Sequence, residues 1–563
     1  LTNFALTGST SNWTNSSSPA SAEQYRSVAS GDWGNLSTWE FFNGCTWQPA
    51  LNTPNYTHSS IVIRSPHTVT INNGGTITED QLTVDTGATL VVQTGLVVAD
   101  DPISDLNILG KVIVDGGTIY GQGEVLIYPS GELKMGNNTL STGSLYVQVT
   151  NNGTITFENS DVACCSDVVY PSIGNITNNS VINFKFHSGI NQADIGTGEL
   201  TNNPSGIINH TFDAIGPSIR NTNLGLNYFI NNGTINNIMG TLLFMEQISN
   251  THNGSFICPD NNGQFTFGTA GTTTFSPSSN IVSNTQVYFL SGNFVLDGAL
   301  STNSFAINSG VVLTGGNYTY SGLSLNNQGT INLNNLELNS LLGQNIFGSG
   351  TIRKLTINNI NDVTLFGDLL ITQELDLSIG QIHTGTNKVI VDAGAIAIGT
   401  GGGWVDGNLQ YNFAGSGIKT YYIGDSTYYS PVTINATVTT PGGLIARSIA
   451  GDHPSIGSST LDATKSVNRT WTFESAGLGF SDLGANFSWD GNESDLIANP
   501  DNFILAQYDG STWTYPTSNV DGNTIYSSGI TSLGDFQIGE LNPCAIPPVF
   551  TICPPDRTVC QDS

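Results

Sequence analysis

Asn151-Asn152-Gly153-Thr154-Ile155 is the clearest copy of the phrase that decides the fold, and Asn231-Asn232-Gly233-Thr234-Ile235 repeats it letter for letter. The copies Asn326-Asn327-Gln328-Gly329-Thr330-Ile331 and Asn72-Asn73-Gly74-Gly75-Thr76-Ile77 each carry one insertion. Some neighbouring copies, including shorter ones that begin at the glycine, lie about twenty residues apart, a spacing typical of solenoid repeats. The recurrence therefore predicts a chain built from stacked coils.

The chemistry of the phrase favours a turn followed by a short strand. Asn and Gly tolerate positive φ angles, so we expect Asn-Asn-Gly to turn the chain sharply. The Thr, Ile and Val residues that follow suit a pleated strand. Apolar residues then alternate with polar ones, as in Ile155 and Phe157 or Ile331 and Leu333, which gives each strand one buried face.

A single short strand cannot bury its apolar face alone, whereas stacked coils cover one another. We therefore expect an all-β chain with a right-handed parallel β-helix, a solenoid, followed by an antiparallel β-sandwich domain. Asparagines at equivalent turns are expected to hydrogen-bond along the stack as amide ladders. An array of ordinary β-sandwiches joined by Asn-Gly hairpins is the alternative fold.

Composition and charge exclude several classes of protein. The 563 residues carry only 14 Lys and Arg against 43 Asp and Glu, a formal net charge of -29. So few cations cannot neutralise a phosphate backbone, which argues against nucleic acid as a partner. Anionic membranes and acidic polysaccharides are disfavoured for the same reason.

No run of 18 apolar residues is present, so we expect no transmembrane insertion. The chain opens without the pattern of a signal peptide, so we expect it to begin after processing.

The seven cysteines indicate an oxidising, extracellular setting, because none forms a Cys-x-x-Cys unit or a zinc-like spacing with histidine. Either of the adjacent Cys164 and Cys165 could reach Cys258 across neighbouring coils. The count is odd and three cysteines crowd the terminus, so one partner is expected beyond Ser563 (Cys544, Cys553 and Cys560).

An aromatic cluster precedes the repeats, with Trp33, Trp39 and Trp47 within fifteen residues of one another. We expect these indole rings to close the open end of the solenoid, which would otherwise expose its core. The alternative is a carbohydrate-binding platform on which the ring faces stack against sugars.

The same region carries a family resemblance. In chain order it contains Arg26-Ser27-Val28, Gly31-Asp32-Trp33, Ser37-Thr38-Trp39-Glu40, Ile61-Val62-Ile63-Arg64 and His67-Thr68-Val69. This series resembles the amino-terminal segment of large surface proteins that Bacteroidetes secrete through the type IX system. It departs from their pattern in having Ser65-Pro66 where the family has Ser-Gly.

A second stretch resembles a module of the same proteins. Beyond the glycine-rich break at 399–403, strands become longer and are separated by turns, as in a sandwich. In the family module a Gly-Asp…Pro-Val segment precedes an Asn-Arg-x-Trp strand, and a Gly-Asp-Phe strand closes the module. The matching residues here are Gly424-Asp425, Pro431-Val432, Asn468-Arg469-Thr470-Trp471 and Gly534-Asp535-Phe536. The two stretches cover roughly a third of the chain.

Five segments are predicted. Residues 552–560 resemble the first strand of a HYR-type immunoglobulin-like repeat, so we expect the native protein to continue. The segments are 1–28, a lead-in; 29–66, a Trp-rich amino-terminal cap; 67–400, the parallel β-helix; 401–541, the β-sandwich domain; and 542–563, a linker and the start of a further HYR or immunoglobulin-like domain.

No candidate catalytic constellation stands out. A glycoside hydrolase needs two carboxylates across one groove. Asp100, Asp101 and Asp105 are close in sequence, as are Glu79 and Asp80, but we expect them to be solvated turn residues. The cations that a lyase resembling the pectate family would need are scattered singly through the repeats (Lys111, Lys134, Lys185, Arg220, Arg353, Lys354 and Lys388).

Metal-ligand spacing is also lacking among the seven histidines, which run from His58 to His453. Asp490-Gly491-Asn492-Glu493-Ser494-Asp495 is the best calcium candidate, but it lacks the glycine and the final glutamate of an EF-hand loop. An Asp-Gly turn at a strand end is the simpler interpretation. The sequence therefore assigns no catalytic, cofactor-binding or metal-binding residue, with a structural Ca²⁺ as the one cofactor to test for.

The function expected from the resemblance and the repeats is that of a non-catalytic secreted adhesin, stalk or filament component. Its place would be the cell surface of a Gram-negative bacterium, with a role in surface attachment or gliding motility. Expected partners are a glycan or surface ligand, further domains of the same chain and other copies of it. The alternatives are a β-helix polysaccharide lyase or glycoside hydrolase and, third, a carbohydrate-binding module.

Overall fold

The computed structural model describes residues 24–542 except 73–74, 101–104, 137–143, 160–165, 171–173, 187–189, 196–197, 213–220 and 400–401. The chain is all-β, and about 14 turns form a β-solenoid, which confirms the predicted fold class. Within the described residues there is no α-helix and no helix able to span a membrane. Contacts divide the chain into two compact units, Leu1–Asn284 and Thr285–Ser563, and the division falls inside β29 (Asn280–Leu296).

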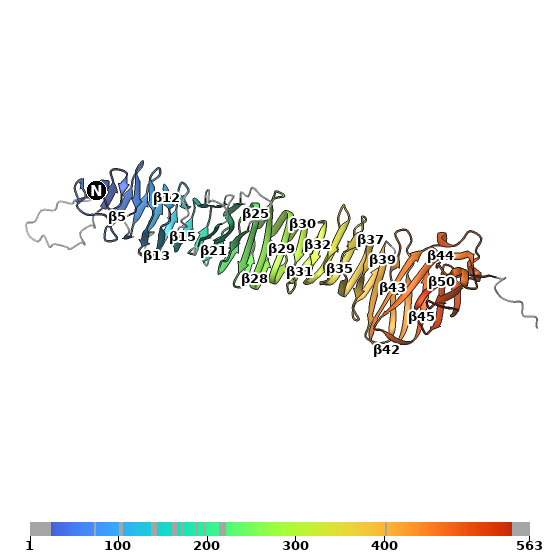
Figure 1. Cartoon of the computed structure of the whole chain (residues 1–563). Helices are drawn as coiled ribbons and strands as arrows, with labels where there is room; N and C mark the ends of the chain where they lie inside the picture. The colour runs from blue at the N-terminus through green and yellow to red at the C-terminus, as the bar shows by residue number, and fades with distance from the viewer. Residues whose placement is uncertain are drawn as a thin grey trace, which may run out of the picture. The chain divides into compact units, whose positions relative to one another are not determined.

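In the first unit, each coil returns a strand to lie parallel beside the equivalent strand of the preceding coil (Figure 1). One row consists of β6 (Thr68–Ile71), β9 (Thr89–Val92), β12 (Lys111–Val114), β14 (Glu132–Met135), β16 (Thr154–Asn159), β19 (Val181–Phe186), β22 (Ile207–Phe212) and β25 (Thr234–Glu246). A second row consists of β5 (Ser60–Ile63), β8 (Leu82–Val84), β11 (Leu106–Ile108), β13 (Thr118–Ile127), β15 (Ser144–Asn151), β18 (Ile176–Asn178), β21 (Glu199–Asn202) and β24 (Tyr228–Asn231).

Constant register places the apolar residue of each repeat directly over the one before it. Leu133, Ile155, Ile182, Ile208 and Ile235 are partners on successive strands, and each is at most 1% exposed. Burial of a side chain of this size contributes about 1.5–3 kcal/mol. The Thr-Ile end of the repeated phrase therefore forms a continuous apolar column inside the unit.

The first asparagine of the phrase forms a second column, which is polar and fully buried. Asn151 donates through Nδ2 to Asn178 Oδ1 over 2.7 Å, Asn178 to Asn202 over 2.7 Å, and Asn202 to Asn231 over 2.8 Å. All four residues are 0% exposed, and Asn231 donates to the carbonyl oxygen of Ser255 over 3.0 Å. The predicted amide ladder is confirmed, and it fixes the stacking register because a slip would leave buried amides unpaired.

The glycine of the phrase has a different role from the one expected. Neither Gly153 nor Gly233, nor the asparagines beside them, has a positive φ, so that part of the prediction is wrong. A Cβ on Gly153 would lie 2.2 Å from the carbonyl oxygen of Tyr128, and one on Gly233 would lie 2.2 Å from that of Gly206. Glycine is required because the backbone of the preceding coil approaches this closely.

Two tryptophans of the predicted cap are buried at the amino-terminal end of the described chain. Here β1 (Gln24–Ser27) pairs antiparallel with β3 (Trp39–Phe42) and parallel with β5. Trp33 and Trp39 are each 1% exposed, with ring centroids 4.9 Å apart. Trp39 Nε1 donates to the carbonyl oxygen of Trp33 over 2.9 Å, and Trp33 Nε1 to that of Pro54 over 3.2 Å. Both indoles are therefore buried with their N–H groups satisfied, as the capping interpretation requires.

The second unit begins as a solenoid and continues into antiparallel sheets. One parallel row consists of β31 (Val312–Tyr320), β33 (Thr330–Leu338), β35 (Thr351–Asn358), β37 (Leu369–Val391) and β39 (Gly403–Phe413). The other edge of β39 pairs antiparallel with β43 (Gly442–Ala450), which starts a sheet completed by β44 (Leu461–Ala476), β50 (Gly534–Leu541) and β46 (Ile504–Tyr508). The solenoid sheet thus passes directly into the antiparallel one.

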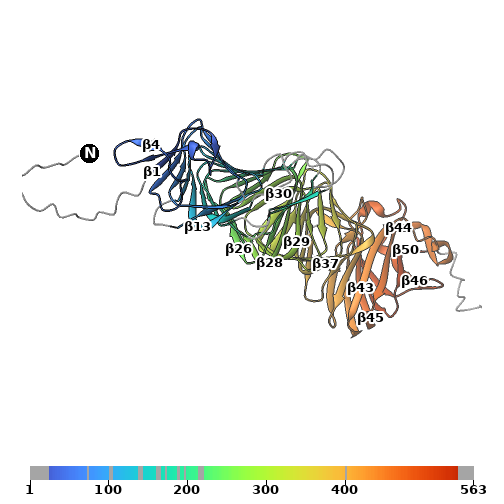
Figure 2. The ribbon, with the colours of Figure 1, turned by 60° about the vertical axis from the view of Figure 1, so that its left-hand side comes forward.

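A separate antiparallel sheet packs against this one. It consists of β40 (Gly417–Tyr421), β42 (Val432–Thr440), β45 (Gly479–Ser488), β49 (Thr524–Ile530) and β48 (Thr517–Asp521). Of these strands, β45 is labelled in Figure 2, beside β43 of the first sheet. Phe473 and Phe536 from the first sheet contact Phe487 from the second at centroid distances of 5.5 and 5.2 Å. These aromatic contacts form the core between the two sheets, which supports the predicted sandwich.

Only part of the predicted cysteine pairing falls on described residues. Cys258 is buried and its Sγ lies 3.6 Å from the carbonyl oxygen of Asp260, whereas Cys45 is exposed. The expected partners Cys164 and Cys165 and the three terminal cysteines lie outside the described residues. The pairing therefore stays a prediction.

Replacement of Asn178 by Ala should destabilise the first unit by about 2–4 kcal/mol, because it leaves buried amide groups of Asn151 and Asn202 without their partner. Asn179→Ala is the matched control. Asn179 belongs to a part-exposed ladder with Asn152 and Asn203, where water can replace the lost bonds, so a loss below about 1 kcal/mol is expected. Urea unfolding followed by far-ultraviolet circular dichroism measures both, and equal losses would refute the ladder's role.

Candidate functional site

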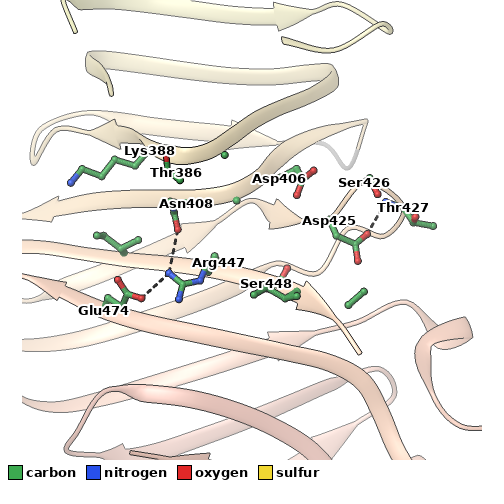
Figure 3. Close-up of a pocket in the computed structure, with 15 residues that line it drawn as sticks. Thr386, Lys388, Asp406, Asn408, Asp425, Ser426, Thr427, Arg447, Ser448 and Glu474 are labelled. Carbon is green, nitrogen blue, oxygen red and sulfur yellow. Dashed lines mark hydrogen bonds and ion pairs between the residues drawn. The ribbon is translucent and has the colours of Figure 1, made fainter. Parts of the chain in front are cut away.

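A polar hollow of about 780 Å³ lies in the second unit, beside the point where the parallel sheet becomes antiparallel (Figure 3). Its volume is in the range of small-molecule sites in proteins. Charged and polar side chains from β37, β39, β43, β44 and the turn after β41 (Ile423–Gly424) surround it: Thr386, Lys388, Asp406, Asn408, Asp425, Ser426, Thr427, Arg447, Ser448 and Glu474.

The hollow forms because β39 changes partner in mid-strand. Val405 and Asp406 pair parallel with β41, whereas Leu409 onward pairs antiparallel with β43. Gly407 lies between the two segments with a φ of +120°, and a Cβ there would be 2.0 Å from Thr384 Oγ1. Only glycine fits such a bend, which leaves the side chains of Asp406 and Asn408 beside the gap.

The two cations at the hollow are paired. Arg447 Nη1 lies 2.7 Å from Glu474 Oε1 and 3.4 Å from Asn408 Oδ1, and Figure 3 shows the guanidinium between these two side chains. Lys388 Nζ lies 3.8 Å from Asp368 Oδ2. These side chains are about a third to a half exposed, so each pair contributes at most about 1 kcal/mol.

Asp406 belongs to a carboxylate–imidazole–carboxylate row across neighbouring coils. His383 Nδ1 lies 2.9 Å from Asp406 Oδ2, and His383 Nε2 lies 3.3 Å from Asp362 Oδ2. The hydrogen bond to Asp406 raises the pKa of His383, partial burial opposes the rise, and Asp362 adds to it. The imidazole is thereby held toward its charged form between two carboxylates.

Asp425, on the other side of the hollow, is held in its ionised form. Burial alone would raise its pKa, but the N–H groups of Tyr428 and Thr427 and the guanidinium of Arg469 outweigh burial and lower it. Thr427 N donates to Asp425 Oδ1 over 2.7 Å and Arg469 Nη2 to Oδ2 over 2.6 Å. A carboxyl group whose pKa is lowered is a poor general acid.

Arg469 joins the hollow to the sandwich core. The guanidinium is 0% exposed and contacts Asp425, Glu493 Oε1 and Ser448 Oγ. Burial raises the pKa of Glu493, and the charge of Arg469 opposes that rise. Glu493 Oε2 also accepts from Ser430 Oγ over 3.2 Å, so the arginine and its partners form one hydrogen-bonded network.

The residues of the second stretch, which resembles a module of the surface proteins, have structural roles in the sandwich. Trp471 Nε1 donates to the carbonyl oxygen of Ser430 over 3.1 Å. Asp535 Oδ1 accepts from Thr472 Oγ1 over 2.6 Å, and Phe536 lies in the aromatic core. Of the matching segments, only Asp425 faces the hollow.

The amino-terminal motif segments also meet one another. Arg26 pairs with Glu40, and the Ser27 hydroxyl lies 2.8 Å from His67 Nδ1 and accepts from the backbone N–H of Arg64 over 2.8 Å. The guanidinium carbon of Arg26 lies 3.9 Å from the ring centre of Trp47. The sequence suggested a carbohydrate-binding platform of Trp33, Trp39 and Trp47 as an alternative. Of these three rings, Trp33 and Trp39 are buried and Trp47 is partly exposed.

The calcium candidate is a capped turn. Asp490 accepts from Asn492 N and Glu493 accepts from Asp490 N at the start of η3 (Gly491–Glu493). Asp495 accepts from Ser466 N over 2.9 Å. Protein donors thus bond to at least one carboxylate oxygen of each acidic residue in the candidate loop, and no described group of three His, Cys, Asp or Glu is arranged to hold a metal.

Glu79 and Asp105, two of the carboxylates considered as hydrolase candidates from the sequence, interact with each other inside the solenoid. Glu79 is 0% and Asp105 1% exposed, so the expectation of solvated turn residues is wrong for both. Burial, then the charges of Asp80 and Asp105, raise the pKa of Glu79. Asp105 Oδ2 accepts from Glu124 N over 2.7 Å. Asp100 is exposed, and Asp101 lies outside the described residues. A substrate cannot reach groups buried to this extent.

Most of the scattered cations that the structure describes pair with carboxylates of neighbouring coils. Lys111 lies 2.8 Å from Glu132, Lys134 3.0 Å from Glu158, and Lys354 3.0 Å from Glu374. Arg353 bonds Asn334, Lys185 is exposed, and Arg220 lies outside the described residues. The pairs neutralise cations within the coils instead of assembling a positive groove for uronate.

Sequence reasoning missed most of the hollow. Asn408, Arg447 and Glu474 come from three strands, and no motif or spacing relates them along the chain. The signal that was present is Gly407 in the Asp-Gly-Asn run, which marks a sharp bend.

Comparison with protein-family models gives no match for the chain, and neither does comparison with curated proteins.

Replacement of Arg469 by Ala should destabilise the second unit by about 3–5 kcal/mol, because it removes the cation that pairs with the buried Glu493 and the partly buried Asp425. Arg469→Lys should restore little, since one ammonium cannot reproduce the forked contacts of a guanidinium. The partly exposed pair of Arg447 and Glu474 supplies the control, and Arg447→Ala should lower the free energy of unfolding by less than about 1 kcal/mol. Differential scanning calorimetry measures all three, and a wild-type-like Arg469→Ala would contradict the network.

The stability contributed by His383 should depend on pH. A raised folded-state pKa means that its contribution is full below the ordinary value of 6.5 and is lost as pH rises through the folded-state pKa. The unfolding temperature of wild type should therefore exceed that of His383→Gln at about pH 5.5 by more than it does at about pH 9. A difference that grows with pH would show the opposite sign and refute the assignment.

Proposed function

We propose that this protein is a non-catalytic, secreted cell-surface adhesin, stalk or filament component. Its β-solenoid serves as a scaffold and its sandwich joins the scaffold to further domains. The observation that supports the proposal is that the ionisable groups at the polar hollow are engaged in structural pairs: Asp406 with His383, Asp425 with Arg469, and Glu474 with Arg447. A scaffold uses charges in this way, whereas a catalytic centre keeps an acid or base available.

The surface of the coils supports the same proposal. Besides the buried ladder, outward asparagines bond from coil to coil, as Asn209 does to Asn183 over 3.0 Å and Asn236 to Asn209 over 2.9 Å. Repeated faces of this kind present the same polar chemistry many times, which suits multivalent, individually weak contacts. The net charge of -29 favours neutral or cationic partners over acidic polymers.

We also propose secretion through the type IX system and a role in attachment or gliding, and the support for both is the sequence resemblance. The residues that carry the resemblance in both stretches have structural roles in the fold, as Arg26 with Glu40 and Trp471 with Ser430 show. An antibody raised against the solenoid should label intact, unpermeabilised producer cells. Labelling that requires permeabilisation would contradict the proposed location at the cell surface.

A polysaccharide lyase or glycoside hydrolase is the second candidate, because the hollow holds three carboxylates, a lysine and an arginine within one site-sized volume. The purified chain should be incubated with neutral and uronate polysaccharides, and new reducing ends and unsaturated sugars should be measured. We expect neither product, together with retention of the chain on at least one immobilised polysaccharide. Release of sugar that Asp406→Asn or Glu474→Gln abolishes would overturn the scaffold proposal.

A further inference from the structure

A second hollow, of about 540 Å³, lies on the outer face of the first unit. It crosses four parallel strands, β7 (Thr76–Glu79), β10 (Gly95–Val98), β13 and β15 (β13 and β15 are labelled in Figure 1). Its lining residues are glycines, threonines and two tyrosines: Thr76, Thr94, Gly95, Gly116, Gly117, Thr118, Tyr120 and Tyr146. We call it the tyrosine groove.

The register of the strands explains the groove. Thr76, Gly95 and Thr118 are partners on successive strands and point outward, because the residues that follow them, such as Leu96 and Ile119, are buried. Gly95 has no side chain, so the row is interrupted between two threonines. A Cβ at Gly95 would lie 2.9 Å from the Thr76 hydroxyl and would begin to fill the gap.

Two aromatic rings stand at one side of this gap. Tyr120 and Tyr146 are register partners on adjacent strands, which places their backbones about 4.8 Å apart. Tyr146 is 45% exposed and Tyr120 is partly exposed, with its hydroxyl 3.4 Å from Thr76 Oγ1. A large ring left this exposed on a strand offers a flat apolar face with a polar tip.

The chemistry of the lining selects the kind of ligand. None of the eight residues is charged, and none carries an aliphatic side chain that an apolar helix of a partner protein would need. Hydroxyl groups of the threonines and tyrosines can donate to and accept from a ligand rich in hydroxyls. Asp115, which precedes Gly116, is bonded to Gln93 over 3.0 Å and leaves an acidic rim that repels anions.

We propose that the tyrosine groove binds a neutral polysaccharide, with sugar rings stacked on Tyr146 and Tyr120 and sugar hydroxyls bonded to the surrounding threonines. Strand-to-strand spacing and an open-sided groove suit an extended chain better than a compact molecule. The inference deepens the proposed adhesive function, on which it rests, by naming the ligand class.

Isothermal titration calorimetry with cello-, manno- and xylo-oligosaccharides tests the groove, with an oligogalacturonate as the charged comparator. At least one neutral series should bind and the oligogalacturonate should not. Tyr146→Ala and Tyr120→Ala should each weaken binding about tenfold or more, whereas Tyr146→Phe should keep most of it because the ring remains. Gly95→Val should abolish binding by filling the gap.

Tyr128→Ala is the matched control, because Tyr128 is 37% exposed, follows the same strand β13 and does not line the groove. It should bind like wild type. Thermal unfolding of every variant separates loss of a ligand contact from loss of fold, and the two Tyr146 variants should unfold within a few degrees of wild type.

The outcomes separate the two proposals. Binding of no neutral oligosaccharide, or equal binding by wild type and the Tyr120 and Tyr146 variants, overturns the groove assignment. Retention of those variants on immobilised polysaccharide would then leave the adhesive function standing with a different contact surface. Release of sugar products by wild type overturns the adhesive function whatever the groove variants do.

Discussion

Coil-to-coil registration is the constraint on which the rest of this structure depends. Each strand must lie in register over its predecessor for the apolar column through Ile155 and Ile182 and the buried amide ladder through Asn151 and Asn178 to form together. The ladder enforces the register more strictly than the apolar column does. Apolar packing tolerates small slips, whereas a displaced amide leaves a buried donor or acceptor without a partner.

The same constraint determines where glycine and charge occur. Gly153 is needed because the coil beneath it passes within van der Waals contact, and Gly407 because β39 must bend where its pairing changes. Charged residues are few, and several on the coils are placed as pairs between adjacent strands, as Lys134 with Glu158 and Lys111 with Glu132 show. A fold that stacks identical faces would otherwise place like charges over one another.

Polar chemistry in this protein therefore serves architecture first. The buried Arg469 looks on paper like a catalytic or ligand-binding cation, yet its guanidinium joins a turn, a 3-10 helix and a strand of the sandwich. The polar hollow and the tyrosine groove differ in this respect. At the hollow the ionisable groups are already paired, whereas the groove presents uncharged rings and hydroxyls toward solvent. That difference is why the ligand proposal rests on Tyr120 and Tyr146.

The sequence by itself determined the repeating architecture. The phrase at Asn151–Ile155 encodes the fold locally, since its amide and its β-branched residue each meet their own counterpart one coil away. The sequence therefore predicted the solenoid, the amide ladder and the change from short repeated strands to longer strands near residue 400. Tertiary structure alone decided that Glu79 and Asp105 are buried and that Gly153 is needed for close approach. It alone also assembled Asn408, Arg447 and Glu474, and placed Tyr120 beside Tyr146. The physical reason is that these properties depend on which residues of other coils and strands come to lie next to them, and no local pattern in the chain records that choice.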